Sequence, residues 1–264
     1  MNIAFVGGGN MAGALIGGML DAGFDAAQVQ VLEVDAARNA EISQRHRVGV
    51  HGAAGEWLKP CEVVVLAVKP QQMREAAAAI QPYLAQPLVL SIAAGVHADT
   101  IAGWLANDRV VRAMPNMPAL IRAGITGAFA LMEVSTAQKS AADRILAAVG
   151  SVIWLDDEAM LDAVTAVSGS GPAYVFYFIE ALQDAARDLG FDAEQARALS
   201  LQTFVGATQL AAQSQETIAA LREKVASKGG TTAAALASLD RDHVDEAIAR
   251  AIRAAAFRAR ELGG

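Results

Sequence analysis

The chain has 264 residues, of which 54% are hydrophobic and only 5% aromatic, and its formal net charge is −7. This length favours two domains, and the alanine-rich composition favours packed helices over an all-β sandwich. No apolar run approaches the roughly 20 residues needed to span a bilayer. The acidic balance, without any basic block, argues against a nucleic-acid partner. Cys61 is the single cysteine, which excludes internal disulfides and cysteine-cluster metal sites.

The first part of the chain alternates short apolar segments with helical ones. The predicted strands are residues 2–6, 30–34, 63–68, 88–92, 110–113, 127–131 and 151–155. The predicted helices are residues 10–21, 36–45, 71–80, 99–105 and 136–149. This alternation is typical of a parallel sheet covered on both faces. The first strand begins at Asn2 with no basic segment before it, so we expect no secretory signal and a cytoplasmic protein.

After Asp156 the strand patterns give way to long helical patterns. The predicted helices here are residues 174–189, 193–213, 217–226 and 244–262. Asp192 resembles a helix N-cap, and Gly190 is expected to end the helix before it. We therefore predict an α/β chain with a Rossmann-type dinucleotide-binding domain over residues 1–157 and an all-helical domain over residues 158–264.

A glycine-rich turn connects the first predicted strand to the first predicted helix. Gly7-Gly8-Gly9-Asn10-Met11-Ala12 fits the G-x-G-x-x-G/A fingerprint, in which the first glycine makes the turn and the second lets backbone approach a pyrophosphate. The start of the helix adds unpaired N–H groups for the phosphates. A tight turn without a ligand is the alternative, but the strand-turn-helix context favours cofactor binding.

The end of the second predicted strand bears on the choice of cofactor. Glu33 lies near the position of the acid that binds a ribose diol, which favours NADH. Arg38 follows a few residues later and is a candidate ligand for the 2′-phosphate of NADPH. Glu33 as a simple exposed strand-end acid is the third possibility. The preference between NADPH and NADH stays open at this point.

Three further segments follow predicted strands, where ligands of such sheets bind. They are Ala67-Val68-Lys69-Pro70, Ala93-Ala94 and the proline-flanked Asn116. Each is a candidate for contact with the cofactor, and Asn116 also for contact with the substrate. Each is equally consistent with an ordinary turn or a stiff connector.

Several kinds of catalytic chemistry have no residues to support them. The four histidines are scattered without metal or triad spacing, so we predict no metal site. A hydroxy-acid dehydrogenase needs a general base for the alcohol proton. After the glycine turn at residues 168–172, Val175 and Ile179 occupy the positions where one large dehydrogenase group has lysine and asparagine. Hydroxy-acid oxidation is therefore disfavoured.

A second glycine motif, Ser227-Lys228-Gly229-Gly230-Thr231-Thr232, precedes a predicted helix over residues 233–239. Two glycines before a helix allow backbone N–H groups to converge on a carboxylate, and a threonine hydroxyl can reach a substrate nitrogen. Reduction of a C=N bond requires mainly placement and one such hydrogen bond. The alternative is a flexible hinge followed by an N-cap at Thr231.

These motifs together resemble the pyrroline-5-carboxylate reductase family over essentially the whole chain. The segments that carry the resemblance are FVGGGNMAGALIGG at the start, LAVKP at 66–70, SIAAGV at 91–96, RAMPNMP at 112–118, AVSGSGPAYVF at 166–176 and VASKGGTT at 225–232. The resemblance implies reduction of 1-pyrroline-5-carboxylate to L-proline by NADPH or NADH, the last step of proline biosynthesis. It also implies a homodimer formed through the helical domain, in some members assembled into a larger ring, with the substrate site completed at the subunit interface.

The resemblance also assigns roles to residues. For the cofactor it implies Val6, Gly7, Gly8, Gly9, Asn10 and Met11 at the pyrophosphate, and Ala67 to Pro70 with Ala93 and Ala94 beside the nicotinamide ribose. For the substrate carboxylate it implies Ser227 and the loop Gly229, Gly230, Thr231 and Thr232, with Thr232 as the catalytic residue at the ring nitrogen.

The chain departs from the family at a few positions. Lys228 replaces a proline of many relatives, Ala54 replaces an asparagine near the adenine ribose, and Glu33-Val34 stands where NADPH-preferring members tend to have Ser, Asn or Arg. The rival interpretations are a hydroxy-acid-type dehydrogenase of the same architecture and a nicotinamide-binding sensor without chemistry. The sensor would have no need of the second glycine motif.

Overall fold

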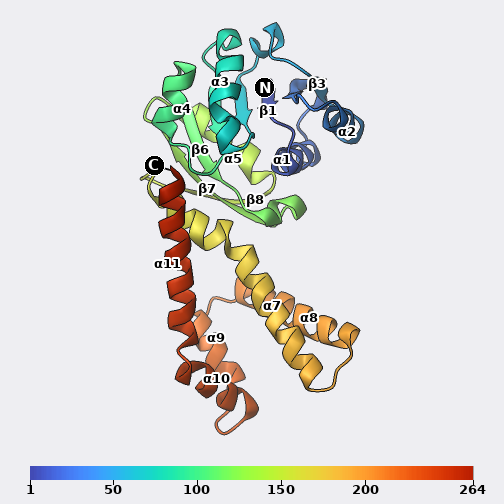
Figure 1. Ribbon diagram of the computed structural model, residues 1–264, viewed down its shortest axis with the longest axis vertical. Helices are drawn as coiled ribbons and strands as arrows, with labels where there is room; N and C mark the ends of the chain where they lie inside the picture. Colours follow the sequence, from blue (N-terminus) through green and yellow to red (C-terminus); the bar gives the residue numbers. More distant parts are fainter. Residues whose placement is uncertain (264) are drawn as a thin grey trace. The chain divides into compact units, whose positions relative to one another are not determined.

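The computed structural model describes residues 1–263, and its first compact unit is built on one eight-stranded sheet. This unit comprises Met1–Ser170 together with the chain from Ala255 onward. The strands lie in the order β3-β2-β1-β4-β5-β6-β7-β8. Figure 1 shows this unit with β1, β3, β6, β7 and β8 labelled. They are β1 (Ile3–Val6), β2 (Val29–Leu32), β3 (Gly49–His51), β4 (Val63–Leu66), β5 (Leu88–Ser91), β6 (Val110–Met114), β7 (Gly124–Ala130) and β8 (Gly150–Trp154).

Side chains of the central strands point alternately to the two faces of the sheet and build two hydrophobic cores. In β1, Ile3 and Phe5 belong to one core and Ala4 and Val6 to the other. Helices α1 (Asn10–Asp21), α2 (Ala36–His46) and α5 (Thr136–Ala147) supply residues to the first core. Helices α3 (Met73–Ile80) and α4 (Ala98–Leu105) supply residues to the second. Burial on both faces explains why these strands are continuously apolar.

Strand pairing departs from the predicted all-parallel sheet in one place. Every neighbouring pair is parallel except β6 and β7, which run antiparallel with Arg112 opposite Phe129. Their connection contains only the short 3-10 turn η5 (Met117–Ile121), whereas a parallel return needs a crossover of about a dozen residues. Strand β3 was not predicted, because its three half-buried residues show no apolar alternation.

The remaining helices follow the sheet in sequence. They are α6 (Met160–Val164), α7 (Gly171–Asp188), α8 (Ala193–Gln213), α9 (Ile218–Val225), α10 (Thr231–Arg241) and α11 (Val244–Gly263). The prediction of an N-cap at Asp192 is confirmed, because its carboxylate and Gln195 form a capping box. Gly190 ends the preceding turn with φ +99°, as its residue type favours. No helix among residues 1–263 is long and apolar enough to cross a membrane.

The second compact unit is helical and comprises Gly171–Ala254. The contacts divide the chain at Ser170 because α6 packs on β6 and β7, which keeps it with the sheet. This division by contacts does not test the predicted domain boundary at residue 157, which stays a prediction. Within the helical unit α7 packs against α8, yet only Ala196 and Ser200 are buried. A unit of this size with so little core needs further apolar surface to cover it.

Candidate active site

The glycine turn between β1 and α1 has the geometry of an anion-binding loop. Gly7 has φ +97°, and a Cβ there would lie 2.9 Å from the carbonyl oxygen of Ala67, so the position requires glycine. Gly9 is the N-cap of α1 and provides no capping side chain, and the first turn of α1 carries no acid. The first N–H groups of α1 are therefore left for an external anion.

A cavity of about 330 Å³ opens beside this turn. It lies where the strand order reverses between β1 and β4, the usual ligand position in doubly wound sheets. Eight of the predicted cofactor residues line it: Val6, Gly7, Gly8, Gly9, Glu33, Ala67, Val68 and Lys69. Much of the remaining wall is formed by Arg38, Gln72, Glu75 and Ala76. The glycines and bare helix start fit a dinucleotide pyrophosphate.

Other predicted cofactor residues lie outside this cavity. Asn10 lines an adjoining hollow with Gly8 and Gly9. The Met11 side chain packs against the first hydrophobic core, so only its backbone in the first turn of α1 is placed for the cofactor. Pro70 begins the short turn η3 (Pro70–Gln72) after β4. Ala93 and Ala94 follow β5, the neighbour of β4 in the sheet.

Asn116 is buried, and both polar atoms of its carboxamide form hydrogen bonds with backbone groups. Its Nδ2 donates to the carbonyl of Ser168 at 3.1 Å, and its Oδ1 accepts from the N–H of Ile125 at 3.0 Å. These bonds connect the loop after β6 to β7 and to the π-helical turn η6 (Thr165–Gly169). The stiff connector, one of the two interpretations of Asn116, accounts for these contacts. A cofactor contact by Asn116 stays a prediction.

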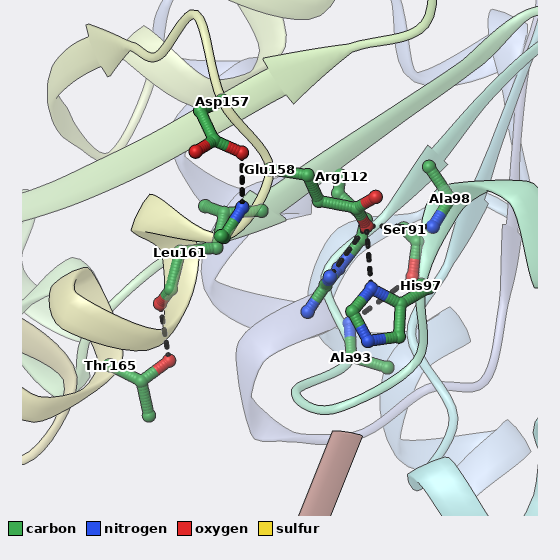
Figure 2. A network of polar contacts seen from close by, with 10 residues as sticks. Ser91, Ala93, His97, Ala98, Arg112, Asp157, Glu158, Leu161 and Thr165 are labelled. Carbon is green, nitrogen blue, oxygen red and sulfur yellow. Dashed lines mark hydrogen bonds and ion pairs between the residues drawn. The ribbon is translucent and has the colours of Figure 1, made fainter. Parts of the chain in front are cut away.

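Figure 2 shows a polar cluster beside the loop that holds Ala93, which no sequence motif predicts. Oε1 of Glu158 accepts from Arg112 Nη1 at 2.6 Å and from the N–H of Ala98 at 2.8 Å, and lies 3.5 Å from His97 Nδ1. The side chain of Arg112 is only 6% exposed and that of Glu158 16%. Glu158 thereby caps α4 and neutralises a buried guanidinium. An arginine inside the apolar strand VVRAM was the signal that a partner must exist.

The C-terminal end of α11 lies against the same loop. A Cβ on Gly95, which has φ +75°, would come within 2.9 Å of the Leu262 carbonyl oxygen. A Cβ on Gly263 would lie 3.5 Å from Nε2 of His97. The loop between β5 and α4 is thus held by Glu158 on one side and by the last turn of α11 on another. Both contacts fix the backbone next to Ala93 and Ala94.

Replacing Glu158 with alanine is expected to lower the free energy of unfolding by about 3 kcal/mol, because Arg112 would stay buried without its carboxylate. Urea denaturation of the full chain measures this. Glu216→Ala is the matched control, since Glu216 pairs with Lys224 at 2.6 Å but both side chains are largely exposed, and such pairs contribute at most about 1 kcal/mol. Equal losses in the two variants would contradict the importance of burial.

In the helical unit, the second glycine motif forms the start of α10. Gly229 has φ +75°, and Gly230 is the N-cap of α10 without a capping side chain. The N–H of Gly230 donates to the Ser227 carbonyl at 3.0 Å, and a Cβ on Gly230 would meet Ser227 Oγ at 2.5 Å. The alternative of an N-cap at Thr231 is wrong, because Thr231 is already the first helical residue. Thr232 is half-buried, whereas Ser227 and Thr231 are exposed.

The described residues contain no group of three or more His, Cys, Asp or Glu side chains that could hold a metal ion. Cys61 is buried, which raises the pKa of its thiol to about 11 and leaves it protonated at neutral pH. Burial also lowers the pKa of His46 and of His51.

Comparison with known proteins agrees with both halves of this description. Residues 2–95 match the family model for coenzyme F420-dependent NADP oxidoreductases, and residues 158–262 match the model for pyrroline-5-carboxylate reductase dimerisation. A solved pyrroline-5-carboxylate reductase from Coxiella burnetii superposes with a TM-score of 0.94 and 38% identity, covering 100% of this chain and 98% of that one. The Plasmodium falciparum enzyme, solved with NADP bound, gives 0.87 and 27% identity with coverage of 100% and 98%.

The curated relatives show the same relationship in sequence. The pyrroline-5-carboxylate reductase of Haemophilus influenzae is 39% identical over 98% of this chain and 97% of its own length. That of Pseudomonas aeruginosa is 45% identical over 98% of this chain and 96% of its own length. With such identity over nearly its full length, and with the dimerisation segment in place, this chain belongs to the pyrroline-5-carboxylate reductase family.

Proposed function

We propose that this protein reduces 1-pyrroline-5-carboxylate to L-proline with a hydride from NADH or NADPH, the last step of proline biosynthesis. The observation that carries the proposal is a pair of uncapped helix starts. One, at α1, borders a cavity suited to a dinucleotide, and the other, at α10, follows two glycines and presents Thr232. Full-length similarity to named pyrroline-5-carboxylate reductases supports the same reaction.

The first helix start serves the cofactor. When bound, NADH or NADPH supplies the hydride. The N–H groups of Gly9 to Met11 would hold the pyrophosphate, because they lie at the start of α1 without a capping side chain. The segments Ala67–Pro70 and Ala93–Ala94 would flank the nicotinamide ribose from the ends of β4 and β5. The buried Arg112–Glu158 pair would keep the second of these segments in place.

The second helix start serves the substrate. The hydroxyl of Ser227 and the N–H groups of Gly230 to Thr232 would bind the carboxylate, aided by the partial positive charge at the start of α10. The Thr232 hydroxyl would hydrogen-bond the ring nitrogen and orient the C=N bond toward the hydride donor. Hydride addition to the carbon leaves the ring nitrogen to gain one proton, which solvent would supply. No separate general base is required, which is consistent with Val175 and Ile179 on α7.

We assign the homodimer interface to the helical unit. Its helices expose large apolar side chains, among them Phe176 at 57%, Tyr177 at 70% and Leu210 at 61%. A hollow of about 650 Å³ between α7 and α8 is lined by Phe176, Tyr177, Ile179 and Leu201 together with the polar Glu180, Gln183 and Arg197. Exposed apolar surface of this extent is typical of an interface. The substrate site would be completed by the partner subunit, and dimers would assemble into a larger ring. Light scattering on the purified protein gives the assembly size.

The lone buried Cys61 fits a reducing compartment, so we place the reaction in the cytoplasm.

The test of function is oxidation of NADH and of NADPH, measured separately, by purified protein supplied with 1-pyrroline-5-carboxylate. Turnover with either, and formation of L-proline, supports the proposal. A folded protein that binds a dinucleotide but turns over neither would overturn the reductase assignment and favour a sensor or a sister dehydrogenase.

A further inference from the structure

The wall of the cofactor cavity at the end of β2 and the start of α2 carries fixed negative charge. We infer that this wall is built for an adenine ribose with a free 2′-hydroxyl, so that the protein binds NADH more tightly than NADPH. The inference rests on the proposed function, since it assumes that the cavity at Gly7 to Gly9 holds the dinucleotide. It assigns the discrimination to Glu33 and Asp35 and gives Arg38 a role common to both cofactors.

Glu33 is held in place by two backbone hydrogen bonds. Its Oε2 accepts from the N–H of Gly8 and its Oε1 from the N–H of Asp35, each at 2.9 Å. Gly8 is buried, so a carboxylate that swung away would leave this N–H without a partner at a substantial cost. The carboxylate therefore stays at the cavity wall. Its remaining lone pairs can accept from ribose hydroxyls, whereas a phosphate dianion beside it would be repelled.

A second carboxylate occupies the donors that a 2′-phosphate would otherwise use. The start of α2 would be a ready anion site, but Oδ1 of Asp35 accepts from the N–H groups of Ala37 and Arg38, both at 2.9 Å. Val34, which lines the cavity between the two acids, is 81% exposed and has no polar side-chain atom. Asp35 therefore occupies the N–H groups of Ala37 and Arg38, and Val34 offers no donor to a 2′-phosphate.

Two cations line the cavity, Arg38 and Lys69. Nη1 of Arg38 lies 3.8 Å from where a Cβ of Gly9 would be, which places the guanidinium beside the glycine that approaches the pyrophosphate. No ion pair within residues 1–263 joins Arg38 to Glu33. Lys69 follows β4, on the other side of β1 from β2. We assign Arg38 to the pyrophosphate, which NADH and NADPH share.

The experiment is direct titration of the purified full chain with NADH and with NADPH by calorimetry, without imine substrate. ADP-ribose and its 2′-phosphate are titrated in parallel, because they isolate the adenine half. We expect NADH to bind at least about tenfold more tightly, as a hydrogen bond to a charged group allows. Glu33→Gln should weaken NADH binding by about tenfold and bring the affinities for NADH and NADPH closer together. Glu33→Asp keeps the charge and should still bind NADPH more weakly than NADH.

Two further variants separate the roles around the cavity. Arg38→Gln should weaken both dinucleotides by similar factors, because it removes a pyrophosphate contact. Glu56→Gln is the charge-matched control, since Glu56 lies outside the lining of this cavity and pairs with the exposed Lys59. It should leave the ratio of the two affinities as in the wild type. Thermal unfolding of each variant checks that the chain is folded.

Equal or tighter binding of NADPH by the wild type would overturn the inference, and so would an Arg38→Gln variant that loses NADPH affinity alone. Failure to bind either dinucleotide would overturn both the inference and the cofactor site on which it rests. Tight, NADH-selective binding without turnover of 1-pyrroline-5-carboxylate would support the inference and contradict the proposed function. The two proposals can therefore fail separately.

Discussion

Gly9→Ala is expected to abolish dinucleotide binding while leaving the protein folded. Gly9 has φ −67° and ψ 177°, a conformation that alanine adopts readily. The nearest atom to an added Cβ is Arg38 Nη1, at 3.8 Å, so the methyl group meets no clash among residues 1–263. It would instead occupy the space in which backbone approaches the pyrophosphate. We expect a loss of about a hundredfold or more in affinity for both NADH and NADPH.

The measurement is the same calorimetric titration, with urea denaturation to confirm stability. Gly13→Ala, one turn further along α1, is the matched control, since its Cβ would lie 3.8 Å from His46 Nε2. That variant should bind dinucleotides like the wild type and gain up to about 1 kcal/mol from helix propensity. Normal binding by Gly9→Ala would show that the pyrophosphate does not approach this glycine.

Thr232→Ala is expected to lower kcat/KM for 1-pyrroline-5-carboxylate by about a hundredfold to a thousandfold, the effect of removing one well-placed hydrogen-bond donor from an active site. Folding should be little affected, because the Thr232 hydroxyl makes no hydrogen bond within residues 1–263 and the N-cap of α10 is Gly230. Steady-state kinetics at saturating cofactor, together with thermal unfolding, separate the two effects.

Thr232→Ser restores the hydroxyl and should recover most of the lost activity. Thr231→Ala changes the exposed neighbouring side chain and should cause a much smaller loss, because Thr231 would contact the substrate through its N–H group. Affinity for NADH should be the same in all three variants, since Thr232 is assigned to the substrate. Unchanged steady-state kinetics in Thr232→Ala would contradict the assignment of this residue to the ring nitrogen.

Local patterns in the sequence were sufficient for most of the fold and for the position of both glycine motifs. Helices α1 and α8 have the predicted bounds, because Gly9 and Asp192 mark their starts and the apolar residues repeat with helical spacing. The glycine turn after β1 requires glycine at Gly7 for a local backbone reason, a positive φ, which the motif itself indicates. The second motif likewise begins a helix, although Gly230 and not Thr231 is its N-cap.

Pairings between distant residues were not predictable in this way. The direction of β7 depends on how a short loop returns to the sheet, and Asn116 fixes that loop through bonds to Ile125 and Ser168. The ion pair of Arg112 with Glu158 joins residues 46 positions apart, and no sequence motif around either residue indicates the other as its partner. Periodicity reports which face of an element is buried, but not which polar groups meet across the sheet.

Glu33 shows the division most clearly. The sequence by itself determined that an acid follows β2 at the distance expected from a glycine turn, and it left three roles open for that acid. Only the tertiary structure decided where the carboxylate points, because one of its two partners is the N–H of Gly8, 25 residues away. Strand and turn patterns depend on neighbouring residues and can be recognised in the sequence. A hydrogen bond between two loops forms only once β1 and β2 have paired in register.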